Sequence, residues 1–205
     1  MQLMKNPNQT RSARCLLAAV SASFLLQSTA SAVSQELTKP AATHERALLK
    51  KRAQANEAAA QFEMGRKCEF GIDTRANARV AAHWYRLAAD QGLDRAEYSL
   101  GRLYFSGEGV RQDRAEAAKY FRRAAVQGYA LAQHRLARAY ELGLGVPQDL
   151  AEAHWWYSLA ADSNGLASSQ LSLKALESSM TEVQLTQARA RSAKLIAVAN
   201  GTRGN

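Results

Sequence analysis

The sequence predicts an all-α protein, an α/α solenoid (superhelix) of three 36-residue helix-pair repeats with capping helices at both ends. The prediction rests on residues that recur at an offset of 36 and on a composition with only three prolines and 47% hydrophobic residues, which argues against disorder. The recurring residues are Gly71, Gly107 and Gly143, then Tyr85, Phe121 and Tyr157, and then the pairs Ala88-Ala89, Ala124-Ala125 and Ala160-Ala161.

The N-terminal segment, residues 1–32, is predicted to be a signal peptide. Three basic residues and no acidic one precede an apolar run from Cys15 to Leu26, and Ala30-Ser31-Ala32 is a small-x-small cleavage pattern. An uncleaved anchor and a buried helix are the alternatives. Cleavage predicts a periplasmic or secreted protein, and no later stretch approaches membrane-spanning length, so no stable span is expected after cleavage.

Charge and cysteine content bear on the class of partner. The 27 Lys and Arg residues outnumber the 18 Asp and Glu residues, and an excess remains after the signal peptide is removed. This balance favours acidic partners, whereas export argues against nucleic acid. Cys68 is the one cysteine of the mature chain, so no intrachain disulfide is expected. It shares a position with Tyr104 and Tyr140 that faces the core, which predicts a buried, inert thiol.

Each repeat resolves into two helices. In the second repeat, Ala96, Leu100 and Tyr104 fall on one face of a first helix. The turn Gly107-Glu108-Gly109-Val110 ends that helix, since glycine adopts left-handed backbone angles readily. Asp113 caps the second helix, and Glu116 completes an acidic variant of the capping box, a device that Asp149 and Glu152 repeat. The second helix buries small alanines and aromatic residues.

The motif A-x-x-x-L-G-x-x-Y, G-x-G-V-x-x-D, then an aromatic pair, A-A and Q-G, resembles the Sel-one-like repeat family, relatives of the tetratricopeptide repeats. Residues 95–130 match it most fully; residues 131–166 match with Ala137 in place of the glycine; residues 59–94 are degenerate, with Cys68 in place of the tyrosine. The resemblance implies a protein-binding adaptor or scaffold without a cofactor, and first helices that line the concave surface.

Capping segments are expected on both sides of the repeats. A linker over residues 33–42 precedes an N-terminal capping helix over 43–58, and two C-terminal capping helices fall within 167–200. Thr181 and Gln184 form a capping box at the second of these. Its predicted buried face comprises Leu185, Ala188, Ser192, Leu195, Ile196 and Ala199. Residues 201–205 are expected to be a tail.

The candidate partner-binding residues lie on the first helices. Arg66, Arg102 and Arg138 recur at the 36-residue offset. Phe62, Tyr98 and His134 come four residues earlier, and Glu69, Phe105 and Glu141 come three residues later. These offsets place each triplet on one helical stripe, so the stacked repeats would present arginine beside aromatic rings, a composition typical of binding surfaces. We therefore expect a surface that holds an acidic segment of a partner protein.

Blander interpretations remain open. The arginines can simply solvate an exposed face, with Glu69 and Glu141 paired to them locally at i, i+3. Trp155, an extra tryptophan beside Trp156, suits either partner contact or packing against the C-terminal cap. A purely structural spacer is a further alternative.

No enzyme is predicted. The histidines 44, 83, 134 and 154 include no pair at the i, i+4 spacing of a helical metal site, and no nucleophile or phosphate-loop motif is present. Cysteine-rich relatives linked to β-lactams suggest a cell-envelope or β-lactam-related hydrolase as the alternative. The single mature cysteine argues against it.

Overall fold

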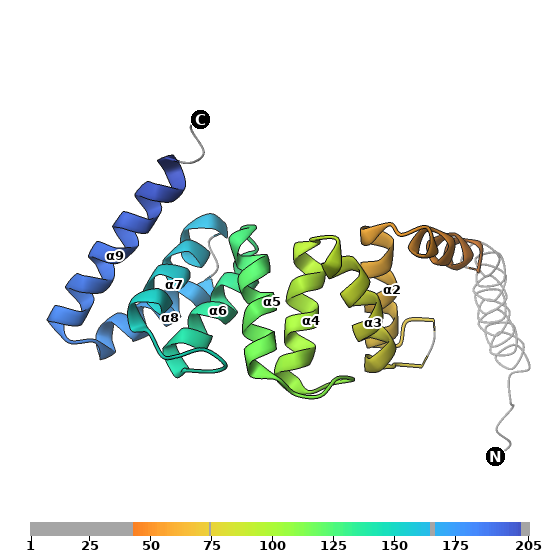
Figure 1. Cartoon of the computed structure of the whole chain (residues 1–205), viewed down its shortest axis with the longest axis horizontal. Coiled ribbons are helices and arrows are strands. Elements are labelled where there is room, and N and C mark those ends of the chain that lie inside the picture. The colour runs from red at the N-terminus through yellow and green to blue at the C-terminus, as the bar shows by residue number, and fades with distance from the viewer. Residues whose placement is uncertain (1–42, 74, 165–166, 202–205) are drawn as a thin grey trace, which may run out of the picture. The chain divides into compact units, whose positions relative to one another are not determined.

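The computed structural model describes residues 43–73, 75–164 and 167–201, and the regular elements of these segments are all helices (Figure 1). The chain divides into two units, residues 1–49 and 50–205. The predicted signal peptide and linker lie outside the described residues, as do residues 202–205. The predicted N-terminal capping helix over 43–58 is shorter in the structure, where helix extends over 43–54. Asn56 follows it with a left-handed φ of 65°.

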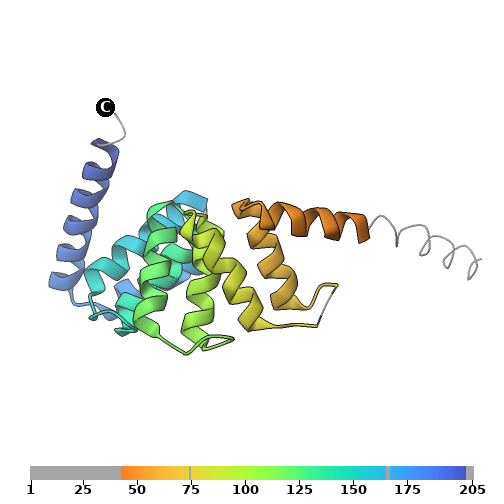
Figure 2. The same ribbon diagram turned by 45° about the vertical axis from the view of Figure 1, so that its right-hand side comes forward.

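Three helix pairs follow one another in the second unit, and each helix packs against the next along the chain (Figures 1 and 2). The pairs are α2 (Ala58–Phe70) with α3 (Ala78–Asp90), α4 (Asp94–Ser106) with α5 (Arg114–Val126), and α6 (Ala130–Leu142) with α7 (Leu150–Asn164). Both α8 (Ala167–Ser179) and α9 (Glu182–Gly201) then pack against α7. The predicted all-α solenoid of three repeats is confirmed.

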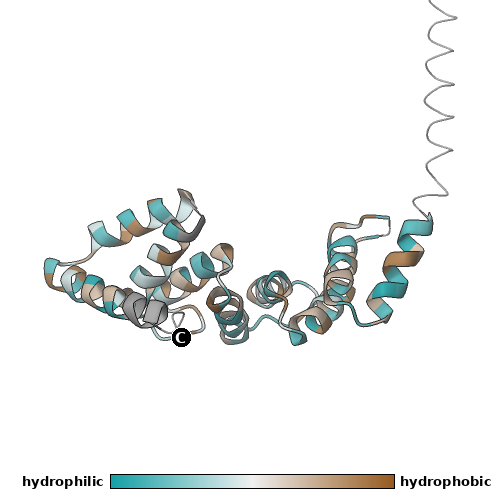
Figure 3. Cartoon of the chain, turned by 90° about the horizontal axis from the view of Figure 1, so that it is seen from above, coloured by the Kyte–Doolittle hydropathy of each residue, from teal (hydrophilic) through white to brown (hydrophobic). Residues whose placement is uncertain are grey.

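Hydrophobic and hydrophilic residues are interspersed along these helices (Figure 3). Small residues allow close packing: a Cβ added at Gly101 would lie 2.8 Å from the ring of Phe121, and one at Gly65 would lie 2.6 Å from Tyr85. Cys68 is 8% exposed, which confirms the predicted buried thiol.

The second helix of each repeat begins at a polar cap. The side chains of Asn77 and Asp113 accept hydrogen bonds from the backbone N–H three residues on, at 3.1 and 2.9 Å, and Asp149 does the same. The full capping box predicted at Asp113 does not form, because the Asp113 N–H donates to the Tyr104 carbonyl and Glu116 pairs with Lys119. The Thr181–Gln184 box does form.

The second glycine of the turn in the second and third repeats packs each of these repeats onto the preceding one. A Cβ on Gly109 would lie 2.3 Å from the backbone of Ala78, where α3 begins. A Cβ on Gly145 would lie 2.1 Å from the backbone oxygen of Arg114, where α5 begins. Both glycines also have positive φ. Glycine is therefore required here both by the close backbone contact and by the backbone conformation.

A polar cluster at Glu97 ties the two helices of the second repeat to each other, and one of its members also reaches the first repeat. Glu97 on α4 is 1% exposed and accepts hydrogen bonds from Arg123 on α5 and from Gln127, the residue that follows α5, each at 2.8 Å. Arg123 also donates to the carbonyl of Ala89 on α3. Burial raises the pKa of Glu97, and this effect outweighs the opposite effect of Arg123 and Gln127.

Candidate protein-binding site

The predicted aromatic residues of the first helices pack against the second helix of their own repeat. Phe62 lies 5.6 Å from Tyr85 between ring centroids, and Tyr98 lies 5.9 Å from Phe121. His134 lies 5.3 Å from Tyr157. All three first-helix rings are half-buried. Their recurrence therefore has a packing role, and they do not project as an exposed ladder.

The first junction, defined by Glu69, Tyr85 and Arg102 between the first and second repeats, is an internally satisfied polar cluster. Arg102 on α4 pairs with Glu69 on α2, and the Tyr85 hydroxyl donates to the same carboxylate at 2.6 Å. Burial and the neighbouring carboxylate raise the pKa of Tyr85. The local pair considered between Arg66 and Glu69 is replaced by a pair between Arg66 and Glu63 at 3.3 Å.

The last junction, between the third repeat and the C-terminal helices, preserves half of this arrangement. The Tyr157 hydroxyl donates to Glu141 at 2.7 Å, and burial together with this carboxylate raises the pKa of Tyr157. The Nδ1 atom of His134 lies 3.0 Å from the Ser169 hydroxyl oxygen on α8. At this junction α6 therefore contacts α8, as α2 contacts α4 at the first junction.

The middle junction, defined by Phe105, Phe121 and Arg138 between the second and third repeats, lacks the polar pair. Phe105 stands where the flanking repeats have glutamate, and Phe121 stands where they have tyrosine. Arg138 is the counterpart of Arg102, but it has no hydrogen-bond or ion-pair partner among the described residues. The guanidinium is retained while the carboxylate that would receive it is missing.

A pocket of about 120 Å³ opens at the middle junction and is called here the arginine pocket. Phe105 and Phe121 contribute apolar rings, and the guanidinium of Arg114 lies 5.8 Å from the Phe105 ring centroid. A second, more open depression shares Phe105, Phe121 and Arg135 with it and has Glu108 among its lining residues. The arginine pocket is lined by Phe105, Arg114, Ala118, Phe121, Arg135, Arg138, Ala139 and Leu144.

The electrostatic environment of the arginine pocket is positive. Neither Arg114, Arg135 nor Arg138 has an ion pair within the described part of the chain, and no acidic residue lines the pocket. The pKa of His134, a neighbour on α6, is lowered by burial first and then by Arg135 and Arg138. An arginine fork presents several N–H donors to a carboxylate, so this arrangement suits an anionic group.

The sequence matches the Sel1 repeat three times, at residues 58–93, 94–129 and 130–165, one residue before the frame used above. The chain belongs to the Sel1 repeat family. Proteins with Sel1 repeats generally serve as scaffolds for protein–protein interaction. No curated protein is similar enough in sequence to count as a relative.

Two solved structures share the Sel1 repeat architecture. One is a protective antigen of uropathogenic Escherichia coli strains with an SLR fold, at 31% identity and a TM-score of 0.67; the alignment covers 73% of this chain and 32% of that one. The other is a Sel1 repeat protein from Oxalobacter formigenes, at 37% identity and a TM-score of 0.59, covering 63% of this chain and 97% of that one. The chain thus spans about a third of the E. coli antigen.

Two pocket residues, Arg114 and Arg135, were missed in the sequence. The counterparts of Arg114 in the flanking repeats are Ala78 and Leu150. The counterpart of Arg135 in the first junction is Ser99, and on α8, after one extra residue at the close of the third repeat, it is Ser172. Comparing repeats for recurring residues selects Arg66, Arg102 and Arg138 but passes over positions where one repeat departs from the others. The departure itself was the available signal.

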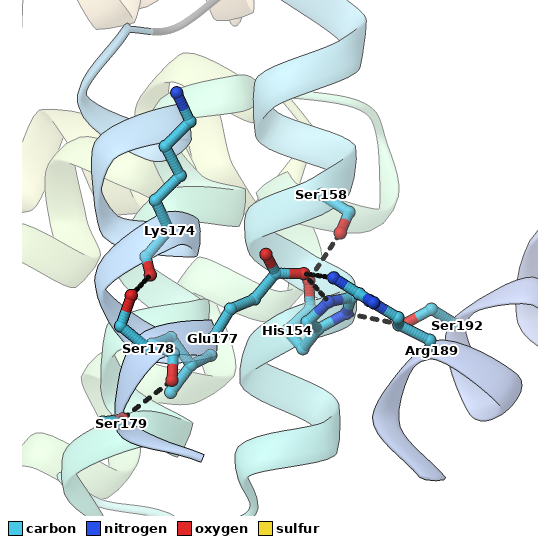
Figure 4. A network of polar contacts seen from close by, with 9 residues as sticks. His154, Ser158, Lys174, Glu177, Ser178, Ser179, Arg189 and Ser192 are labelled. Carbon is cyan, nitrogen blue, oxygen red and sulfur yellow. Dashed lines mark hydrogen bonds and ion pairs between the residues drawn. The ribbon is translucent and has the colours of Figure 1, made fainter. Parts of the chain in front are cut away.

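A Ser–His–Glu arrangement near the end of the Sel1 array resembles a catalytic triad in composition (Figure 4). The ring nitrogens of His154 lie 3.1 Å from the Ser192 hydroxyl and 3.0 Å from Glu177, which also pairs with Arg189. His154 and Ser192 are each 5% exposed, so a substrate cannot reach the hydroxyl. The cluster instead ties α9 to α7 and α8, and the hydrogen bond from His154 is the main cause of the lowered pKa of Glu177.

The remaining candidate outside the arginine pocket is Trp155. It is half-buried against the core cluster that includes Leu176 of α8, which supports packing against the C-terminal cap. Ala188 and Ser192 of α9 are buried as predicted, whereas the side chains of Leu195, Ile196 and Ala199 lie outside the described part.

Across 43–73, 75–164 and 167–201, His, Cys, Asp and Glu side chains form no group of three or more able to hold a metal ion. In the same segments, no helix combines the length and apolar character needed to cross a bilayer.

Proposed function

We propose that this Sel1 repeat protein is an exported adaptor that holds an acidic segment of a partner protein at the face built by α4 and α6. One observation carries the proposal: Arg114, Arg135 and Arg138 line one pocket, and the described part of the chain supplies no carboxylate to pair with them. Arginine with aromatic rings is a composition enriched at protein-binding hot spots. Of the predicted ladder, Arg138 and Phe105 belong to this site, while Arg66 and Arg102 are paired within the chain.

The binding test uses a fluorescein-labelled hexaglutamate peptide and the chain without residues 1–32, followed by fluorescence anisotropy. Binding should be saturable and should weaken as salt rises, because exposed charges are screened within about 8 Å at physiological ionic strength. Replacing Arg114, Arg135 and Arg138 by glutamate should abolish binding.

The matched control carries the same change in charge elsewhere. Lys50, Arg75 and Arg79 are exposed and do not line the arginine pocket. Replacing these three by glutamate should leave affinity within about twofold, apart from a small change in long-range attraction. Equal losses in both triple variants would mean that net charge, and not the pocket, governs binding, and the proposed site would be wrong.

Export is tested separately by the mass of the full-length gene product recovered from the periplasm or medium. Cleavage after Ala32 predicts a mature chain that begins at Val33. Recovery of the intact chain from the cytoplasm alone would overturn this part of the proposal.

A further inference from the structure

We infer that the arginine pocket receives one glutamate side chain of the partner, whose carboxylate pairs with Arg138 as that of Glu69 pairs with Arg102 at the first junction. This inference rests on the proposed function and specifies its ligand: a protein carboxylate on a short apolar stem. It follows from comparing equivalent positions of the three repeats.

The first junction shows what this scaffold does with a carboxylate. The Glu69 side chain is only 10% exposed, and it is held by the Tyr85 hydroxyl and by Arg102 from the following repeat. A carboxylate enclosed between repeats is therefore compatible with the backbone spacing, provided that an arginine of the next first helix faces it.

At the middle junction, the two residues that would form the internal pair are changed together. Phe105 replaces the glutamate and Phe121 replaces the tyrosine, so neither a hydroxyl nor a carboxylate is left without its partner. The counterpart of Arg102, however, is still an arginine, Arg138. Internal packing explains the paired phenylalanines, but it gives no reason for an arginine beside them.

The middle junction also gains charge. Arg114 replaces the Ala78 of the first junction, and Arg135 replaces Ser99. Guanidinium groups that line one pocket without a carboxylate repel one another. A bound anion is therefore stabilised more by electrostatic attraction here than at the first junction. The site therefore favours a carboxylate from outside the chain.

The pocket dimensions and lining indicate a glutamate side chain as the occupant. A volume of about 120 Å³ suits one side chain and not a helix face. Phe105 and Leu144, both half-buried, offer apolar surface for the two methylene groups of glutamate, whereas aspartate has only one. We therefore expect hexaglutamate to bind more tightly than hexa-aspartate, by about fourfold for one methylene group.

The deciding experiment restores the internal pair. The Phe105→Glu/Phe121→Tyr variant recreates the glutamate and tyrosine of the flanking repeats. The carboxylate introduced at position 105 should form an ion pair with Arg138. Hexaglutamate affinity should fall by at least about tenfold, since the arginine is engaged and a like charge now faces the peptide. Thermal unfolding should show that the variant remains folded.

The control is Phe105→Gln/Phe121→Tyr, which introduces similar polar groups without the charge. It should keep hexaglutamate affinity within about threefold of the wild type. Loss of a charge-assisted hydrogen bond would lower affinity by more than this. If the glutamate and glutamine variants bind equally, the carboxylate position is wrong. Efficient displacement of the peptide by millimolar inorganic phosphate would also overturn the inference, because it would indicate a general anion site.

Failure of this inference and of the proposed function are distinguishable. If the Arg114/Arg135/Arg138 triple variant loses binding while Phe105→Glu/Phe121→Tyr keeps it, the arginine face binds acidic segments but the inferred glutamate position is wrong. If wild type does not bind hexaglutamate saturably, the proposed function itself is overturned.

Discussion

The first and middle junctions occupy equivalent positions in the repeat but differ in where their charges are neutralised. At the first junction, Arg102 is paired with Glu69 inside the chain. At the middle junction, Arg138 faces Phe105, and two further arginines line the same pocket. The repeat determines the backbone at both places, whereas function depends on positions where one repeat departs from its neighbours. Variants made at equivalent positions can therefore separate stability from binding.

The largest effect is expected at the turn glycines that stack the repeats. Gly109→Ala and Gly145→Ala should each lower the free energy of unfolding by about 3 kcal/mol or more, since the added Cβ meets backbone and φ is positive. Gly128→Ala has positive φ but open space, so its cost should be about 1 kcal/mol. Chemical denaturation measures all three.

These glycines also distinguish the junctions functionally. Gly145 abuts the backbone of Arg114, which lines the arginine pocket, whereas Gly109 abuts Ala78 at the first junction. At a temperature where all variants are folded, only Gly145→Ala should weaken hexaglutamate binding. Equal affinity for the Gly109 and Gly145 variants would contradict the difference drawn between the junctions.

The next effect compares the two equivalent arginines. Arg102→Gln should cost about 1 kcal/mol of stability, because the Arg102 side chain is 37% exposed and its ion pair is partly screened. Arg138→Gln should cost nothing measurable, or stabilise slightly, because it removes a repelling charge. Urea unfolding would contradict the comparison if both variants lost the same stability, and hexaglutamate affinity should respond in the opposite order.

How far the sequence predicts these features depends on the range of the interactions. The period, the glycine turns and the caps at Asp113 and Asp149 involve nearby residues or recurring packing positions, so the fold could be predicted. The pairing of Arg102 with Glu69 joins different repeats and depends on side-chain direction. Recurrence alone could not show that Arg66 and Arg102 are neutralised while Arg138 is not.

An effect of similar size tests the tyrosine hydroxyls at the flanking junctions. Tyr157→Phe removes a donor from Glu141, which has no ion pair among the described residues, so the loss should be about 1–2 kcal/mol. Tyr85→Phe should cost less, about 0.5–1 kcal/mol, because Arg102 still holds Glu69. Thermal and urea unfolding should rank the variants in this order; the reverse ranking would mean that Arg102 contributes little to the first junction.

The smallest effect is a change in the titration of His134, a reporter beside the arginine pocket. In the free protein, burial and then Arg135 and Arg138 lower the pKa of His134, so protonation favours the unfolded chain. Its contribution to stability should therefore decline as pH falls below the ordinary histidine value of about 6.5. A bound carboxylate offsets the charge of Arg135 and Arg138 but leaves the burial, so saturating hexaglutamate should raise this pKa only part of the way back. NMR titration of the imidazole signals measures the change, with exposed His83 as the internal control. An unchanged pKa of His134 at saturation would place the peptide away from the middle junction, because a carboxylate paired with these two arginines necessarily alters the field at their neighbour.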